Sequence, residues 1–141
     1  MSHVATLALA LLVPLLALSC ASEERAPEPD LPGIVGAWTI AEVLGTEVAG
    51  EGVVLTLGSD GSLSGHTGVN SLTGSYEMSE GALSFSPLAT TRMAGPPELM
   101  DQEVRFTEAL GRTRRGDVGE DGRLALKDDA GETLILATPR P

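Results

Sequence analysis

The stretch VVLTLGSDGSLSGHTGVNSLTGSYEMSEGALSF, residues 53–85, decides the fold, because short apolar segments and turn residues alternate along it. We predict its four apolar segments to be strands, at residues 53–57, 63–66, 72–78 and 83–85. Gly58-Ser59-Asp60-Gly61 contains an Asp-Gly pair, which tolerates the positive φ of tight hairpins, and Ser79-Glu80-Gly81 makes a second turn. The stretch therefore predicts antiparallel strands joined by hairpins.

Strand-like segments also lie on both sides of this stretch. We predict further strands at residues 38–43, 90–93, 123–126 and 133–137. The connections are predicted to be a loop at 45–52, a turn at 117–122 and a hairpin turn at 128–131.

Residues 96–111 have the pattern of an amphipathic helix. Pro96 and Pro97 suit a first helical turn, and Gly111 is a typical residue at a helix end. One face carries the apolar residues Leu99, Met100, Val104, Phe106 and Leu110. The predicted fold class is therefore α+β, a small antiparallel β-sheet or partly closed β-barrel with one amphipathic helix, formed by residues 33–141.

Composition excludes some classes of function. The 141 residues include 9 Lys and Arg and 20 Asp and Glu, which gives a formal net charge of −11. Such a chain lacks the basic face that a nucleic-acid binder needs, so no nucleic acid is expected as a partner. With one cysteine, neither an intrachain disulfide nor a cysteine-based zinc cage is possible, and we expect no cofactor.

The first 19 residues are predicted to be a secretory signal peptide. Residues 4–18 are almost entirely apolar, too short for a comfortable bilayer span and interrupted by Pro14. The run ends in Leu16-Ala17-Leu18-Ser19-Cys20, which resembles the lipobox of bacterial lipoproteins. Cleavage after Ser19 would free Cys20 for lipidation, and several acyl chains would anchor the protein stably in a membrane. The alternative is a free thiol in an ordinary secreted chain.

Residues 20–32 are predicted to be the lipidated Cys20 followed by a flexible tether. Acidic residues and prolines fill this segment, and it has almost no large apolar residue that could pack in a core. The expected location is the bacterial cell envelope, with the protein anchored by lipid. Ala21, rather than Asp, after the cysteine favours the periplasmic face of the outer membrane.

Several motifs resemble those of the META domain family, which includes HslJ-like bacterial lipoproteins. They are Gly36-Ala37-Trp38-Thr39, Leu63-Ser64-Gly65-His66-Thr67-Gly68-Val69-Asn70 with Gly74-Ser75-Tyr76, Ala89-Thr90-Thr91-Arg92-Met93-Ala94-Gly95, the helix residues Glu103, Phe106 and Leu110, and Leu124 to Leu126. The resemblance covers residues 36–137. It implies an envelope protein linked with stress or drug tolerance, and it supplies no catalytic residues.

Two departures from the family pattern occur together. Many members have cysteine where this chain has Val69 and Gly95. The resemblance implies a disulfide in those members, and this chain forgoes about 2–4 kcal/mol of stabilisation without it.

His66 is the residue with the most obvious catalytic potential. It lies two residues after Ser64 and close in sequence to Asp60, so a hydrolytic site using His66 is one hypothesis. The favoured interpretation is a surface or turn histidine. Similarly, the acidic segments 117–122 and 128–132 could attract calcium, but they lack the spacing of an EF-hand loop and suit turns. We expect no metal site.

The basic residues suggest a contact surface. Arg112, Arg114 and Arg115 could meet a phosphate or lipid headgroup, but we favour compensation of the helix dipole. Arg92, in the Thr-Arg-Met motif, is the candidate binding residue. Gly68 and Asn70 are expected to serve backbone geometry, because both residue types accept positive φ.

The leading functional hypothesis is a non-enzymatic envelope lipoprotein that serves envelope integrity or stress tolerance. It would bind an unidentified protein or a small apolar ligand and reach the membrane through its lipid anchor. The alternative is a periplasmic carrier or pilot-like lipoprotein, with a partly open barrel that binds an acyl chain or partner protein.

Overall fold

The computed structural model describes residues 33–141. The predicted signal peptide, the lipidated Cys20 and the tether up to residue 32 lie outside the described residues. Among the residues described, no helix is long and apolar enough to cross a membrane.

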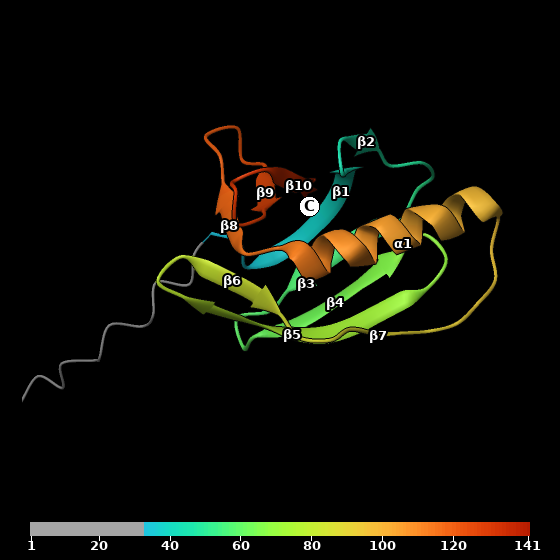
Figure 1. Ribbon diagram of the computed structural model, residues 1–141, viewed down its shortest axis with the longest axis horizontal. Helices are drawn as coiled ribbons and strands as arrows, with labels where there is room; N and C mark the ends of the chain where they lie inside the picture. The colour runs from blue at the N-terminus through green and yellow to red at the C-terminus, as the bar shows by residue number, and fades with distance from the viewer. Residues whose placement is uncertain (1–32) are drawn as a thin grey trace, which may run out of the picture.

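Ten strands and one helix make up the fold (Figure 1). They are β1 (Gly36–Val43), β2 (Thr46–Glu47), β3 (Val53–Leu57), β4 (Ser62–Thr67), β5 (Ser71–Ser79), β6 (Ala82–Phe85), β7 (Ala89–Thr90), α1 (Pro97–Arg112), β8 (Arg115–Val118), β9 (Leu124–Lys127) and β10 (Thr133–Pro139). The sheet runs β10-β9-β8-β6-β5-β4-β3-β1, and the antiparallel pairing of β1 with β10 closes it into a barrel. The α+β prediction is confirmed, and of its two forms the barrel is the one observed.

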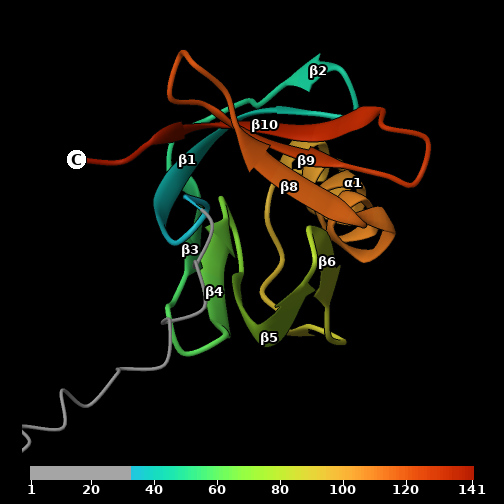
Figure 2. The same ribbon diagram turned by 90° about the vertical axis from the view of Figure 1, so that its left-hand side faces the viewer.

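One seam of the barrel is much weaker than the others. The strands β6 and β8 share a single paired position, Ala82 opposite Arg115, supported by a bond from the Leu83 N–H to the Arg114 carbonyl oxygen. The helix α1 connects these strands in sequence and lies on this side of the barrel (Figure 2). The wall beside β6 is therefore completed by a helix rather than by a strand.

Two bulges let the closing strands fill the core. Between Ile40 and Glu42 the register of β1 against β10 shifts, so Ala41 is an extra residue and the buried side changes from Ile40 to Val43. A second shift in β10 leaves both Leu134 and Ile135 buried. Strict alternation would have turned one of each pair toward solvent.

The barrel interior is filled with side chains. Nineteen apolar residues form one buried cluster, which includes Trp38 from β1, Leu55 from β3, Leu72 from β5, Leu126 from β9 and Phe106 from α1. The indole Nε1 of Trp38 donates to the Ile34 carbonyl oxygen at 2.8 Å, so the aromatic ring is buried without an unpaired donor. The interior that the alternative function, a barrel holding an acyl chain, would need is therefore occupied by the core.

The helix follows the predicted pattern with three differences. Phe106 and Leu110 are fully buried, but Val104 is 63% exposed and Leu99 is only half-buried. The helix also continues one residue past Gly111, because Thr113 caps it by donating from its N–H to the Leu110 oxygen and from its hydroxyl to the Ala109 oxygen.

Two strands were not predicted, and a third is shorter than expected. The strand expected at residues 90–93 is only β7, because the chain leaves the ladder after Thr91 and is held by a side chain instead. The strand β8 was missed, since its polar residues Arg115–Val118 lack an apolar alternation. The short strand β2 lies within the expected loop at 45–52.

Candidate functional site

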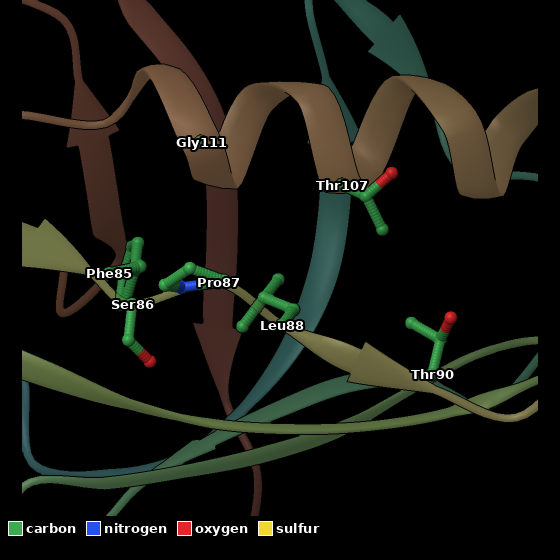
Figure 3. A pocket seen from close by; sticks show the side chains of 7 residues that line it. All are labelled: Phe85, Ser86, Pro87, Leu88, Thr90, Thr107 and Gly111. Atoms are coloured by element: carbon green, nitrogen blue, oxygen red, sulfur yellow. The ribbon is translucent and has the colours of Figure 1, made fainter.

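A groove of about 500 Å³ lies between α1 and the segment that joins β6 to β7 (Figure 3). It is lined by Phe85, Ser86, Pro87, Leu88, Thr90, Thr107 and Gly111. It lies on the side of the barrel where β6 has little strand partner, so the groove is a direct consequence of the weak seam. No charged side chain is among its lining residues.

The floor of the groove is rigidly attached to β5. The backbone N–H of Ser86 donates to the Ser75 carbonyl oxygen, and the Ser86 hydroxyl accepts from the Ser75 N–H at 2.9 Å. Gly74 allows this close approach: a Cβ there would lie 2.8 Å from Cδ2 of Leu88. A larger residue at position 74 would push the floor away from the strand.

The helix α1 forms the roof of the groove. This roof is apolar because the Thr107 hydroxyl is turned back to the helix backbone. The Thr107 Oγ1 donates back to its own helix, with the Glu103 carbonyl oxygen at 3.0 Å, and its methyl group points down from the helix into the groove (Figure 3). Gly111 has no side chain to cover the next turn of the helix, and a Cβ at that position would meet no atom within 4 Å. The groove therefore offers an apolar slot between Leu88 and Thr107 that is open at Gly111.

The C-terminal end of α1 places a guanidinium beside the groove. Arg114 Nη1 donates to the carbonyl oxygens of Gly111 at 2.9 Å and Thr113 at 2.8 Å. For Arg114, this contact with the carbonyl end of the helix agrees with the expected compensation of the helix dipole. Arg112 forms ion pairs with Glu108 and Asp128, whereas Arg115 belongs to β8. The three arginines thus make different contacts, although Arg114 shares a hollow with each of the other two.

Asn70 organises a polar network that the sequence did not reveal. It is 1% exposed, its amide nitrogen donates to the Glu103 carboxylate and the Met93 carbonyl oxygen, and its Oδ1 accepts from the Thr91 hydroxyl and the Met93 N–H. Thr67 donates its hydroxyl to the same Glu103 carboxylate. The expectation of positive φ is correct for Gly68, at 97°, and wrong for Asn70, whose side chain is what the fold uses.

Arg92 lies between the two residues that Asn70 holds. Because Thr91 and Met93 are both anchored, the exposed Arg92 is presented on a fixed piece of backbone. Among residues 33–141 it has no carboxylate within ion-pair distance. Met93 beside it is 57% exposed. Arg92 does not line the groove, so these features form two separate surfaces.

His66 lies on β4, opposite Val54 and Ser71. Its Nδ1 accepts a hydrogen bond from the Gly68 N–H at 3.0 Å, so that nitrogen serves the turn after the strand. Ser64 lies on the same strand, opposite Thr56 and Thr73. These contacts match the favoured interpretation of a turn histidine.

The acidic residues proposed as alternative calcium ligands take part in turns. The Oδ1 atoms of Asp121 and Asp128 accept from the backbone N–H groups of Arg123 and Ala130, two residues further on, as Asp60 does with Ser62. Asp117 pairs instead with Lys127 across β8 and β9. In the part of the chain that the structure describes, no three potential ligands gather as a metal-binding group.

Tyr76 links the hairpin turn at Gly58 to Phe85 on β6. The Tyr76 hydroxyl donates to the Gly58 carbonyl oxygen at 2.6 Å, and its ring meets Phe85 edge-on. Desolvation, followed by the negative charge of Asp60, raises the pKa of Tyr76 above 10.0. Hydrogen bonds from the Ser62 hydroxyl and N–H lower the pKa of Asp60 below 3.8.

Val69 and Gly95 lie against each other. A Cβ at Gly95 would be 3.5 Å from the Cβ of Val69, which is within the separation found in disulfides. In this chain the Val69 side chain fills the space left by the missing Cβ. The inference that cysteines at these two positions are paired in other members agrees with this geometry.

The fold defines a small antiparallel β-barrel with one helix across its weakest seam. A model of the META domain matches residues 32–140, and the chain belongs to the META domain family. This confirms the resemblance found in the sequence motifs.

Two solved structures share the fold. One, an NMR structure of a protein from Burkholderia xenovorans, is 30% identical, with 76% of this chain and 79% of that chain covered and a TM-score of 0.55. A second NMR structure is 21% identical over 74% of this chain and 87% of its own, with a TM-score of 0.56, and it shows the fold alone. No curated protein matches the chain.

Neither the groove nor the role of Asn70 is predicted by the sequence. Phe85 was visible as the end of a strand, and Pro87 as a residue that cannot continue one. Neither signal shows that Thr107, 20 residues after Pro87, packs over this segment, since that contact depends on closure of the barrel.

Proposed function

We propose that this META domain protein is a non-enzymatic binding protein of the bacterial envelope that takes a small apolar ligand in the groove beside α1. The observation that supports the proposal is the groove itself. Its volume of about 500 Å³ lies in the range of ligand sites, and Phe85, Leu88 and the Thr107 methyl group make its walls apolar.

The chemistry of the lining favours binding over catalysis. The Ser86 hydroxyl is hydrogen-bonded to Ser75 and the Thr107 hydroxyl to its own helix. A nucleophile needs an adjacent base, and none of the groove-lining side chains is a base. The role proposed for the bound state is support of envelope integrity or stress tolerance.

The first test uses a neutral apolar fluorophore, N-phenyl-1-naphthylamine, whose emission rises in apolar sites. We expect saturable binding to the full chain carrying Cys20→Ser, so that no attached acyl chain competes. Gly111→Leu should abolish it, because a side chain there enters the open end of the groove. Gly111→Ala, which adds one methyl group, is the control and should still bind. Equal binding by the Leu variant would refute the groove as the site.

The envelope location rests on the sequence around Cys20. The apolar run before it and the acidic tether after it support a lipid anchor, with the domain on the periplasmic face of the outer membrane. In cells fed a labelled fatty acid, Cys20→Ser should lose the label and leave the membrane fraction. Ser22→Ala, two residues away, should keep both. Retained label in the Cys20 variant would disprove the anchor.

The alternative function is a carrier or pilot-like lipoprotein that delivers an acyl chain or partner protein. It would use the same groove, because the barrel interior is filled. Native mass spectrometry of the purified full chain separates the two roles: a carrier should retain a co-purified lipid, whereas a sensor or structural binding module with weaker affinity should not.

A further inference from the structure

The groove has an internal direction, which follows from the residues at its open end. Along α1 it passes from Thr107 to Gly111, and Arg114 Nη1 is 2.9 Å from the carbonyl oxygen of Gly111. An apolar slot thus leads to a guanidinium. A ligand that matches both features is an amphiphile with a hydrocarbon chain and an anionic head.

Arg114 has donors left for such a head. Its Nη1 group is engaged with Gly111 and Thr113, so the edge formed by Nη2 and Nε remains. That edge is the planar fork that matches a carboxylate. Within residues 33–141 no carboxylate lies within 4.0 Å of Arg114, whereas Arg112 is already paired with Glu108 and Asp128.

A second hollow lies beside this fork, and its lining residues are distinct from those of the groove. It has a volume of about 320 Å³ and is lined by Leu83 and Ser84, which precede Phe85 on β6, together with Glu77, Ser79, Ala82, Arg114, Arg115 and Asp129. Two acidic and two basic residues line this hollow, so its lining has no net charge. A bound head group is therefore selected by the geometry of the Arg114 fork rather than by a positive field.

The polar groups of the groove favour a hydrocarbon over a peptide. A peptide brings a backbone N–H and C=O at every residue, and each needs a partner when buried. The hydroxyls of Ser86 and Thr107 are already engaged and Pro87 has no N–H to offer, so among the lining side chains only the Thr90 hydroxyl is left for a polar partner. A hydrocarbon chain needs no such partners.

Resting on the proposed function, we infer that the groove binds a single-chain fatty acid, with the chain between Leu88 and Thr107 and the carboxylate on Arg114. The chain supplies affinity that rises about fourfold per buried methylene until the groove is full. The fork of Arg114 adds selectivity for the acid over the corresponding alcohol, by about tenfold.

The test is calorimetric titration of the full chain, carrying Cys20→Ser, with decanoate and with decanol at neutral pH. Decanoate should bind about tenfold more tightly. Arg114→Gln should reduce decanoate to the affinity of decanol and leave decanol unchanged. Arg105→Gln, which removes the same charge from α1 at a residue that lines neither the groove nor the second hollow, is the matched control and should keep the tenfold difference.

The outcomes separate this inference from the function on which it rests. Equal affinity for the two ligands, or a tenfold preference that survives Arg114→Gln, overturns the carboxylate contact and leaves the apolar groove intact. Failure of both ligands to bind, or binding that Gly111→Leu does not reduce, overturns the groove as well. The comparison of the two ligands needs no arginine variant, so it decides even if Arg114→Gln does not fold.

Discussion

The side-chain amide of Asn70 donates to both carboxylate oxygens of Glu103, with N···O distances of 3.2 and 3.0 Å. This contact joins the connection between β4 and β5 to the middle of α1. We expect Asn70→Ala to lower the free energy of unfolding by about 2–3 kcal/mol, because it leaves the Met93 N–H without a partner and the Glu103 carboxylate with only the Thr67 hydroxyl. Urea unfolding measures the change.

A graded control tests whether the network is the cause. Thr91→Val keeps Asn70 and removes only the Thr91 hydroxyl, which donates to Asn70 Oδ1 and accepts from the exposed Ser71 N–H, and it should cost about 1 kcal/mol. If Asn70→Ala cost no more than Thr91→Val, the network would not be what holds α1 in place.

The contact between Val69 and Gly95 predicts a disulfide that can be restored. In a Cys20→Ser background, Val69→Cys with Gly95→Cys should oxidise spontaneously, because a Cβ at position 95 lies 3.5 Å from that of Val69. The bond should raise stability by about 3 kcal/mol. Thiol titration and unfolding with and without reductant check this. Each single cysteine variant is a control, and an unoxidised double variant would contradict the prediction.

We expect a substitution at Gly111 to raise the free energy of unfolding. It lies in the last turn of α1, and a Cβ there meets no atom within 4 Å. Gly111→Ala should therefore stabilise the protein by about 0.5–1 kcal/mol, the difference in helix propensity. The contrasting variant is Gly65→Ala, whose Cβ would lie 2.5 Å from the Val54 carbonyl oxygen and which should destabilise. Thermal unfolding of both variants tests the pair, and opposite signs are required.

Tyr76 predicts a loss of stability at alkaline pH. Desolvation and the charge of Asp60 raise its folded pKa above the ordinary value of 10.0. A raised pKa means that the stabilisation is complete below pH 10.0 and is lost as the pH rises through the folded pKa.

The matching variant is Tyr76→Phe. At neutral pH it should be about 1 kcal/mol less stable, for lack of the bond to the Gly58 carbonyl oxygen. The gap should close above about pH 10, because only the wild type must keep a phenol neutral. Urea unfolding across this pH range measures the gap, and a constant difference would show that Tyr76 does not titrate in the transition.

Much of the local structure could be predicted from the sequence. The alternation in residues 53–57 and 72–78 and the Asp-Gly turn between Gly58 and Gly61 are signals that neighbouring residues carry by themselves. Gly61 indeed has a φ of 82°. The prolines at the start of α1 and the spacing of Phe106 and Leu110 likewise determined the helix and its buried face.

Tertiary structure alone decided where the barrel closes and what lies beside the weak seam. The pairing of β1 with β10 joins the two ends of the domain, and Ala41 becomes a bulge only because that partner sets the register. From its sequence neighbours alone, Asn70 is predicted to be a turn residue. Its role appears only when residues 23 and 33 positions away, Met93 and Glu103, are brought to it. Turn and helix signals act between near neighbours, whereas closure, the network and the groove depend on contacts between distant segments, which local sequence does not specify.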